Sequence, residues 1–218
     1  YKRQYMNYQI TQEMPEYFPD LDQMLFHLPL VGQTFKKVWW DSTMDRQCSQ
    51  FVKAEDFVVA PESKDLYTSL RYTHVIRIPK NDYNRYVQSG YYLPSDDTGG
   101  DIDPSGDTIG DIEGVDQYGD DSQDEVMTLL EMHVYDNFED DIDDDDQNAV
   151  GIPYVVTVDY DNENIVSIRR NWREEDDMKK RRDWFVSYKF LPGLGFYGFG
   201  LYHPVSYTHL RAHETVLD

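Results

Sequence analysis

The sequence has little cysteine, no long apolar run and, over a long middle section, no positive charge. The only cysteine, Cys48, excludes an internal disulfide framework and a multi-cysteine zinc site. No run approaches the roughly 18–20 apolar residues that a membrane span requires, so we expect no membrane partner. Aromatic residues make up 15 % of the chain, which argues against full disorder.

The negative charge belongs to one section. No Lys or Arg lies between Arg85 and Arg169, and this section holds 24 of the 42 acidic residues. The rest of the chain carries 18 acidic and 20 basic residues, so the formal charge of −22 does not by itself predict a basic partner. Half of the 24 acids lie in residues 94–125, which have few large apolar side chains. We predict a disordered insertion there, because so little burial cannot offset the loss of chain entropy.

Hydrophobic spacing predicts an α+β fold of short antiparallel strands with a leading helix. Phe18, Leu21, Met24, Leu25 and Leu28 are spaced as one packed helix face. A Pro-Leu-Val-Gly sequence after them is expected to close this helix at residues 29–32.

Eight further segments have strand character, and one has a second helical pattern. The strands are predicted at residues 34–40, 49–52, 56–60, 71–78, 126–135, 152–159, 164–170 and 183–190. The second helix is expected to begin with Asn81 or Asp82 as its cap and to end at Gly90.

These segments suggest one interrupted domain. Residues 1–93 supply the helix and first strands, residues 94–125 the acidic insertion, and residues 126–204 the second strand group. Residues 205–218 are expected to be a non-native tail, because VSYTHLRAHET back-translates to a common transposon-type sequencing adapter. His209 and His213 in that tail are therefore not metal ligands. The chain begins at Tyr1, and we expect it to be an internal fragment of a longer protein.

No motif makes a case for catalysis, a metal or a cofactor. Two acid-rich segments, at residues 101–106 and 141–145, begin like calcium loops but have isoleucine at the twelfth position, where glutamate belongs. A G-x-G-x-x-G pattern at residues 193–198 lacks the strand-turn-helix context of a dinucleotide site. Its glycines are predicted to form a structural turn instead: Gly193, Gly195, Gly198 and Gly200. His27, His74 and His133 lie in different predicted elements, so we expect no enzyme and no cofactor.

One basic segment interrupts the acidic half of the chain. It contains Arg169, Arg170, Arg173, Lys179, Lys180, Arg181 and Arg182. The acids at residues 174–177 leave a net charge of +3 over residues 169–182. Two interpretations stay open: a self-neutralising solvated link, or a contact to nucleic-acid phosphate or another acidic partner. Because four consecutive cations cannot all point into a core, we expect Lys179, Lys180, Arg181 and Arg182 to matter for assembly or DNA passage more than for folding.

The order of the segments resembles the portal proteins of short-tailed bacteriophages. The segments that carry the resemblance are LFHLPLVG at 25–32, TFKKVWWD at 34–41, FVKAEDFVVA at 51–60, THVIRI at 73–78, IPYVVTVD at 152–159, SIRRN at 167–171 and WFVSYKFLPGLGFYGFGL at 184–201. The resemblance covers about residues 15–95 and 126–203 and leaves out the acidic insertion.

The resemblance implies a subunit of a ring, usually twelve-fold, at one vertex of the capsid in the virion. Double-stranded DNA passes through such a ring in packaging and ejection. The implied partners are the terminase, capsid or scaffold proteins and tail adaptors, and assembly takes place in the host cytoplasm. The fragment would correspond to the outer wing of the subunit, a structural part without catalysis of its own.

Two alternatives remain at this stage. One is a non-enzymatic acidic module that binds calcium or a basic partner, and the other is an unrecognised hydrolase that uses two of the many carboxylates. A calcium-dependent melting shift would favour the first, and activity lost on one Asp→Asn change would favour the second.

Overall fold

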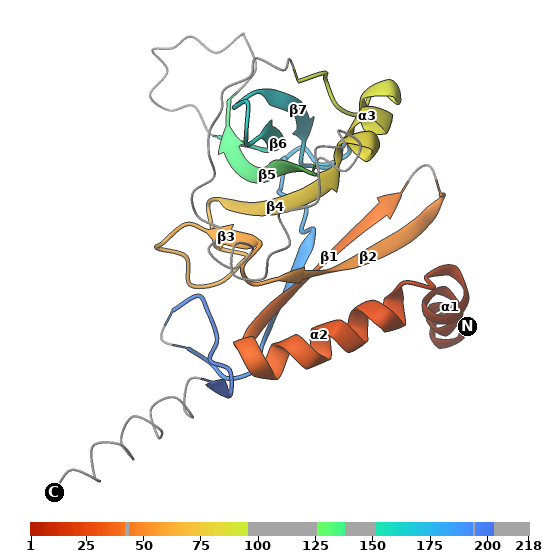
Figure 1. The fold of residues 1–218 in the computed structure, drawn as a ribbon. Helices are drawn as coiled ribbons and strands as arrows, with labels where there is room; N and C mark the ends of the chain where they lie inside the picture. Colours follow the sequence, from red (N-terminus) through yellow and green to blue (C-terminus); the bar gives the residue numbers. More distant parts are fainter. Residues whose placement is uncertain (42–43, 96–125, 138–150, 194, 203–218) are drawn as a thin grey trace, which may run out of the picture. The chain divides into compact units, whose positions relative to one another are not determined.

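The computed structural model describes residues 1–41, 44–95, 126–137, 151–193 and 195–202 (Figure 1). Three α-helices lie in this part of the chain: α1 (Lys2–Tyr8), α2 (Tyr17–Val31) and α3 (Lys80–Gln88), with a π-helical turn η1 (Gln9–Glu13) between the first two. The strands are β1 (Gln33–Asp41), β2 (Arg46–Lys53), β3 (Phe57–Val59), β4 (Tyr72–Pro79), β5 (Val126–Asp136), β6 (Ile152–Asp159), β7 (Ile165–Arg170) and β8 (Phe185–Lys189). None of the helices described is long and apolar enough to cross a membrane.

The strands form two antiparallel sheets, so the predicted α+β class with a leading helix is confirmed. One sheet has the order β2-β1-β8, and the other has the order β3-β4-β5-β6-β7. All eight predicted strands are present, with ends that differ by a few residues. The helix α3 begins at Lys80 after Pro79 and has no side-chain cap, so the prediction of a cap at Asn81 or Asp82 is wrong. The extended backbone of Pro79, with φ −60° and ψ 142°, starts this helix without such a cap.

The chain divides into two compact units that differ from the predicted strand groups. Unit 1 comprises Tyr1–Tyr72 and Arg181–Asp218, and unit 2 comprises Thr73–Lys180. Each unit therefore takes residues from both 1–93 and 126–204. Of the predicted insertion, the structure describes only Pro94 and Ser95. The rest of it, both calcium-like segments and the tail at 205–218 lie outside the described residues.

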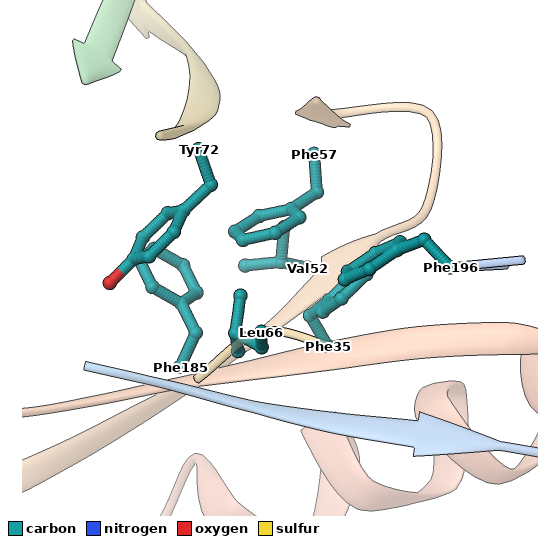
Figure 2. Packing of buried hydrophobic residues seen from close by; sticks show 7 residues of the cluster. All are labelled: Phe35, Val52, Phe57, Leu66, Tyr72, Phe185 and Phe196. Carbon is teal, nitrogen blue, oxygen red and sulfur yellow. The ribbon is translucent and has the colours of Figure 1, made fainter. Parts of the chain in front are cut away.

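Unit 1 has an aromatic core that joins distant parts of its chain (Figure 2). Its buried members are Phe35, Val52, Phe57, Leu66, Tyr72, Phe185 and Phe196. The rings of Phe35 and Phe57 stack with centroids 4.1 Å apart, and Phe57 lies 4.9 Å from Phe185. Since such rings bury large apolar areas, this cluster is the main hydrophobic anchor of unit 1.

The helix α2 packs on this unit with part of the predicted face. Met24 is buried and Leu21 and Leu28 are partly buried, but Phe18 and Leu25 are 50 % and 52 % exposed, so the prediction is wrong for these two. The covered side also carries Asp20, whose carboxylate accepts a 2.6 Å hydrogen bond from the Phe51 amide.

The same carboxylate forms an ion pair inside unit 1. Lys36 is 4 % exposed, and its Nζ lies 3.4 Å from Asp20 Oδ2 and 4.0 Å from the centre of the Tyr17 ring. A buried charge is tolerated only when it is paired, so this contact compensates for the burial of Lys36 on the covered side of α2.

The helix α2 ends at a left-handed glycine. Gly32 has φ 98°, and its amide donates to the Leu28 carbonyl at 2.9 Å. Only glycine adopts such a backbone without strain, which makes it a frequent helix terminator. Pro29 lies inside the helix and does not end it. The last helical residue is Val31, two residues after Pro29.

Unit 2 has a smaller core and a buried polar group. Tyr83, Tyr92, Leu129 and Val166 form the apolar cluster. The buried polar group is Asp159, at the turn between β6 and β7. Its carboxylate is fully buried and accepts hydrogen bonds from Ser95 Oγ at 2.7 Å and from the Asn162 side chain at 2.9 Å. Ser95 therefore belongs to the folded part of the chain rather than to the predicted insertion.

Candidate functional site: the basic segment between β7 and β8

The basic segment begins at the end of β7. In the β6–β7 register, Arg169 lies opposite Val155 and Arg170 lies opposite Tyr154. After β7, the Asn171 amide donates to the Pro153 carbonyl at 3.0 Å, which keeps the chain next to β6 for one more residue. The sheet thus fixes where the first cations of the segment stand.

Arg170 and Lys179 both lie against the ring of Trp172. The Arg170 Cζ atom is 5.6 Å from the ring centre, and the Lys179 Nζ atom is 5.4 Å from it. Tyr154 meets the same ring edge-on, with centroids 5.3 Å apart. A cation within about 6 Å of an aromatic face is attracted by the ring quadrupole. These four residues form what we call the cation–tryptophan cluster.

A tight turn places Lys179 in this cluster. Asp176 accepts hydrogen bonds from the amides of Met178 at 3.1 Å and Lys180 at 3.2 Å, and its carbonyl accepts from the Lys179 amide at 3.0 Å. Lys179 has φ 45°, in the left-handed region that residues with a side chain seldom adopt. The carboxylate of Asp176 thus shapes the backbone of the turn.

Arg169 has a separate partner. Its guanidinium lies over the Tyr91 ring, with Cζ 4.1 Å from the ring centre, and donates a hydrogen bond to the Tyr91 hydroxyl. The segment after α3 is tied in this way to the end of β7. Arg169 therefore works at least in part as a link within unit 2.

Arg181 points into unit 1. Its guanidinium donates to the carbonyls of Ser69 at 2.6 Å, Leu66 at 3.0 Å and Tyr67 at 3.0 Å. It also lies 5.1 Å from the centre of the Tyr72 ring. Because one side chain satisfies three backbone acceptors, Arg181 holds the segment between β3 and β4 in its conformation.

The remaining cations of the predicted set are exposed. Lys180 and Arg182 are open to solvent, and the Arg182 Cζ atom lies 4.9 Å from the centre of the Trp184 ring. The four consecutive cations are therefore not equivalent: Lys179 joins the Trp172 ring, Arg181 binds backbone carbonyls, and the other two face solvent. Their roles in assembly and DNA passage stay a prediction.

The glycines predicted as a structural turn lie against the end of α2. A Cβ at Gly200 would stand 2.2 Å from the Leu30 carbonyl oxygen, and one at Gly198 would stand 2.5 Å from the Gly32 carbonyl oxygen. A Cβ at Gly193 would stand 1.9 Å from a carbonyl oxygen of the segment itself, whereas Gly195 has nothing within 4 Å. Three of the four glycines are thus positions of close backbone approach.

This approach lets residues 190–201, which we call the glycine segment, bind the last carbonyls of α2. The Leu201 amide donates to the Pro29 carbonyl at 2.7 Å, and the Phe190 amide donates to the Gly32 carbonyl at 2.9 Å. The Gly198 amide donates to the side chain of Gln33 at 2.8 Å. The carbonyls at the end of a helix need partners from outside the helix, and here a distant part of the chain supplies them.

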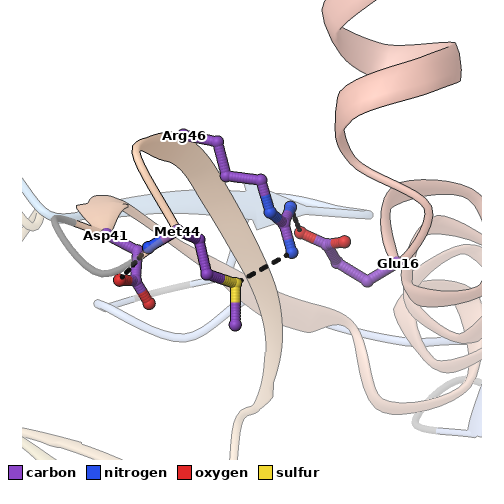
Figure 3. A network of polar contacts seen from close by, with 4 residues as sticks. All are labelled: Glu16, Asp41, Met44 and Arg46. Atoms are coloured by element: carbon purple, nitrogen blue, oxygen red, sulfur yellow. Dashed lines mark hydrogen bonds and ion pairs between the residues drawn. The ribbon is translucent and has the colours of Figure 1, made fainter.

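A polar network joins the start of α2 to β2 (Figure 3). Arg46 donates to Glu16 Oε1 at 2.5 Å and contacts the Met44 sulfur at 3.5 Å, while Asp41 accepts from the Met44 amide at 3.2 Å. Burial acts to raise the pKa of Glu16, but the hydrogen bond from Arg46, a backbone hydrogen bond and the charge of Arg46 together outweigh it, and the pKa lies below its ordinary value. The hydrogen bond to Glu16 likewise raises the pKa of Arg46.

Two features of the site were not predicted from the sequence. Trp172 stands two residues after Arg170 and seven before Lys179, a spacing that follows no regular element. The buried pair of Glu131 and His133, 3.2 Å apart, was also missed. Its signal was present, because residues two apart in a strand point to the same face.

The described residues contain no group of three or more His, Cys, Asp or Glu side chains that could hold a metal ion. No family model matches the sequence, and no curated protein matches it.

Proposed function

We propose that this chain is part of a portal subunit of a short-tailed phage, a structural protein of the ring through which double-stranded DNA is packaged and ejected. The observation that carries the proposal is the ordered set of seven sequence segments. Any one of them is a common pattern, but their order along the chain is specific. In this proposal the protein has no catalytic step, and its partners are further copies of itself, the terminase, capsid or scaffold proteins and tail adaptors.

The positions of the segments support the proposal. They supply the end of α2, most of β1, β3, β4, β6 and β8, and the glycine segment. These parts supply five of the seven buried members of the aromatic core of unit 1 and the two strands, β4 and β6, on either side of β5. The resemblance therefore rests on residues that determine the fold, which is where relatives with a shared structural role would agree.

An exposed apolar side of α2 also fits a subunit of an assembly. Phe18, Leu25 and Leu30 are 50 %, 52 % and 50 % exposed, and Phe26 is 71 % exposed. Exposed apolar side chains gathered on one element are typical of surfaces that another part of an assembly covers.

Electron microscopy of the full-length protein tests the proposal. Ring particles with a central channel are the expected result, with twelve subunits as the expected number. By contrast, static light scattering of residues 1–204 at micromolar concentration should show a monomer or weak association, because the resemblance assigns this fragment to the wing. A full-length protein that stays monomeric would refute the portal role, and a stable ring made by residues 1–204 alone would refute the wing assignment.

A further inference from the structure

The cation–tryptophan cluster brings two cations to one aromatic ring. Arg170 and Lys179 lie 5.6 Å and 5.4 Å from the centre of the Trp172 ring in unit 2. In the part of the chain that the structure describes, no ion pair joins either cation to an acidic side chain.

The cluster is fixed by the fold on both sides. On one side, the β6–β7 register sets Arg170 opposite Tyr154, whose ring also holds Trp172 edge-on. On the other side, the turn organised by Asp176 holds Lys179 at φ 45°. A left-handed backbone at a lysine costs energy and persists only where its surroundings impose it, which often marks a functional position.

The acid that shapes the turn is bonded to backbone. The Asp176 oxygens accept from the backbone amides of residues 178 and 180. Other exposed cations of the chain do have acidic partners: Lys53 is 3.4 Å from Glu55, and Arg85 is 3.3 Å from Asp82. No such ion pair is seen for Arg170 or Lys179 in the described part of the chain.

We propose that Arg170 and Lys179 bind phosphate groups of the backbone of duplex DNA. The inference rests on the proposed function, in which DNA is a partner, and it adds the residues that make one contact. Trp172 is already in contact with Arg170, Lys179 and the Tyr154 ring. We therefore expect a ligand to meet the two cations and not an open aromatic face. Binding of unstacked bases uses open aromatic faces, whereas duplex binding uses cations that contact phosphates. The contact is therefore independent of base sequence.

Salt-dependent binding of the 218-residue chain to short duplex DNA tests the inference. Affinity is measured at several salt concentrations, starting at low salt because the chain carries a charge of −22. Each phosphate contact removed makes the plot of log affinity against log salt shallower by about one. The double variant Arg170→Gln/Lys179→Gln should thus have a slope shallower by about two, and the loss should be equal for duplexes of different sequence.

Two controls separate binding from folding. Arg170→Lys/Lys179→Arg keeps both charges and should keep the slope, while Lys53→Gln/Arg85→Gln removes two cations that have acidic partners and should also keep it. The inference is overturned if the wild-type chain does not bind duplex DNA at low salt, if the first variant keeps the wild-type slope, or if the chain prefers a polyglutamate peptide to DNA at equal salt. Ring formation is scored separately, so a ring with an unchanged slope would refute only this contact.

Discussion

Replacing Arg181 with methionine should destabilise unit 1, although Arg181 belongs to a run of four cations. Methionine keeps much of the length of the side chain but removes all the donors. Three carbonyls, those of Ser69, Leu66 and Tyr67, then lose the guanidinium that binds them at 2.6–3.0 Å.

The expected loss is about 2–4 kcal/mol. A buried acceptor left without a partner costs about 1–3 kcal/mol. The contacts to Ser69 and Leu66 are only partly buried, so each is taken at the lower end, about 1–1.5 kcal/mol. Loss of the contact with the Tyr72 ring adds about 0.5–1 kcal/mol. Water can reach the exposed carbonyl of Tyr67, so that contact adds little.

Urea unfolding of the chain measures the loss, and amide exchange over residues 66–72 locates it. Arg182→Met is the matched control: Arg182 is exposed and has a ring contact of the same kind, with Trp184, so its replacement should cost no more than about 0.5–1 kcal/mol. An Arg181→Met variant as stable as this control would refute the structural role. The result also decides how to test the basic segment, because replacing all four cations at once would mix folding with binding. Lys179, Lys180 and Arg182 should be changed without Arg181.

Three further outcomes are expected. Gly200→Ala should cost about 1–3 kcal/mol in urea unfolding, because the added Cβ meets the backbone of α2. Gly195→Ala places its Cβ in open space and should cost far less. Equal effects of the two changes would contradict the close approach. Ser95→Ala should cost about 1–2 kcal/mol, because the buried Asp159 carboxylate loses a donor, and thermal melting that matches the wild type would show that this bond adds nothing. Glu16→Gln should lower the melting temperature at pH 7, and the difference should shrink in acid: the pKa of Glu16 is lowered on folding, so its contribution is fully present above the ordinary value of 4.5 and is lost as the pH falls through the lowered pKa. A difference that persists in acid would contradict this origin.

Local patterns in the sequence predicted the elements well. The strand segments were found because β-forming residues between turn residues are a local signal, and every predicted strand appears in the structure. The end of α2 at Gly32 follows from one residue that tolerates a left-handed backbone. The cap of α3 was predicted wrongly, since Asn81 and Asp82 are common capping residues but the backbone of Pro79 had already started the helix.

The sequence by itself predicted the eight strands, the helices α2 and α3 and the place of the acidic section, but not α1 or η1. Only the tertiary structure showed which side of α2 is covered, because Phe18 and Met24 both belong to the predicted apolar face, whereas only Met24 is buried, on the side where Asp20 meets Lys36. It also decided which of four adjacent cations holds the fold. Arg181 reaches Ser69 across 112 positions, and Gly198 reaches Gln33 across 165. Periodicity records only the nearest neighbours along the chain, so contacts between such distant positions become visible only when the sheets have brought them together.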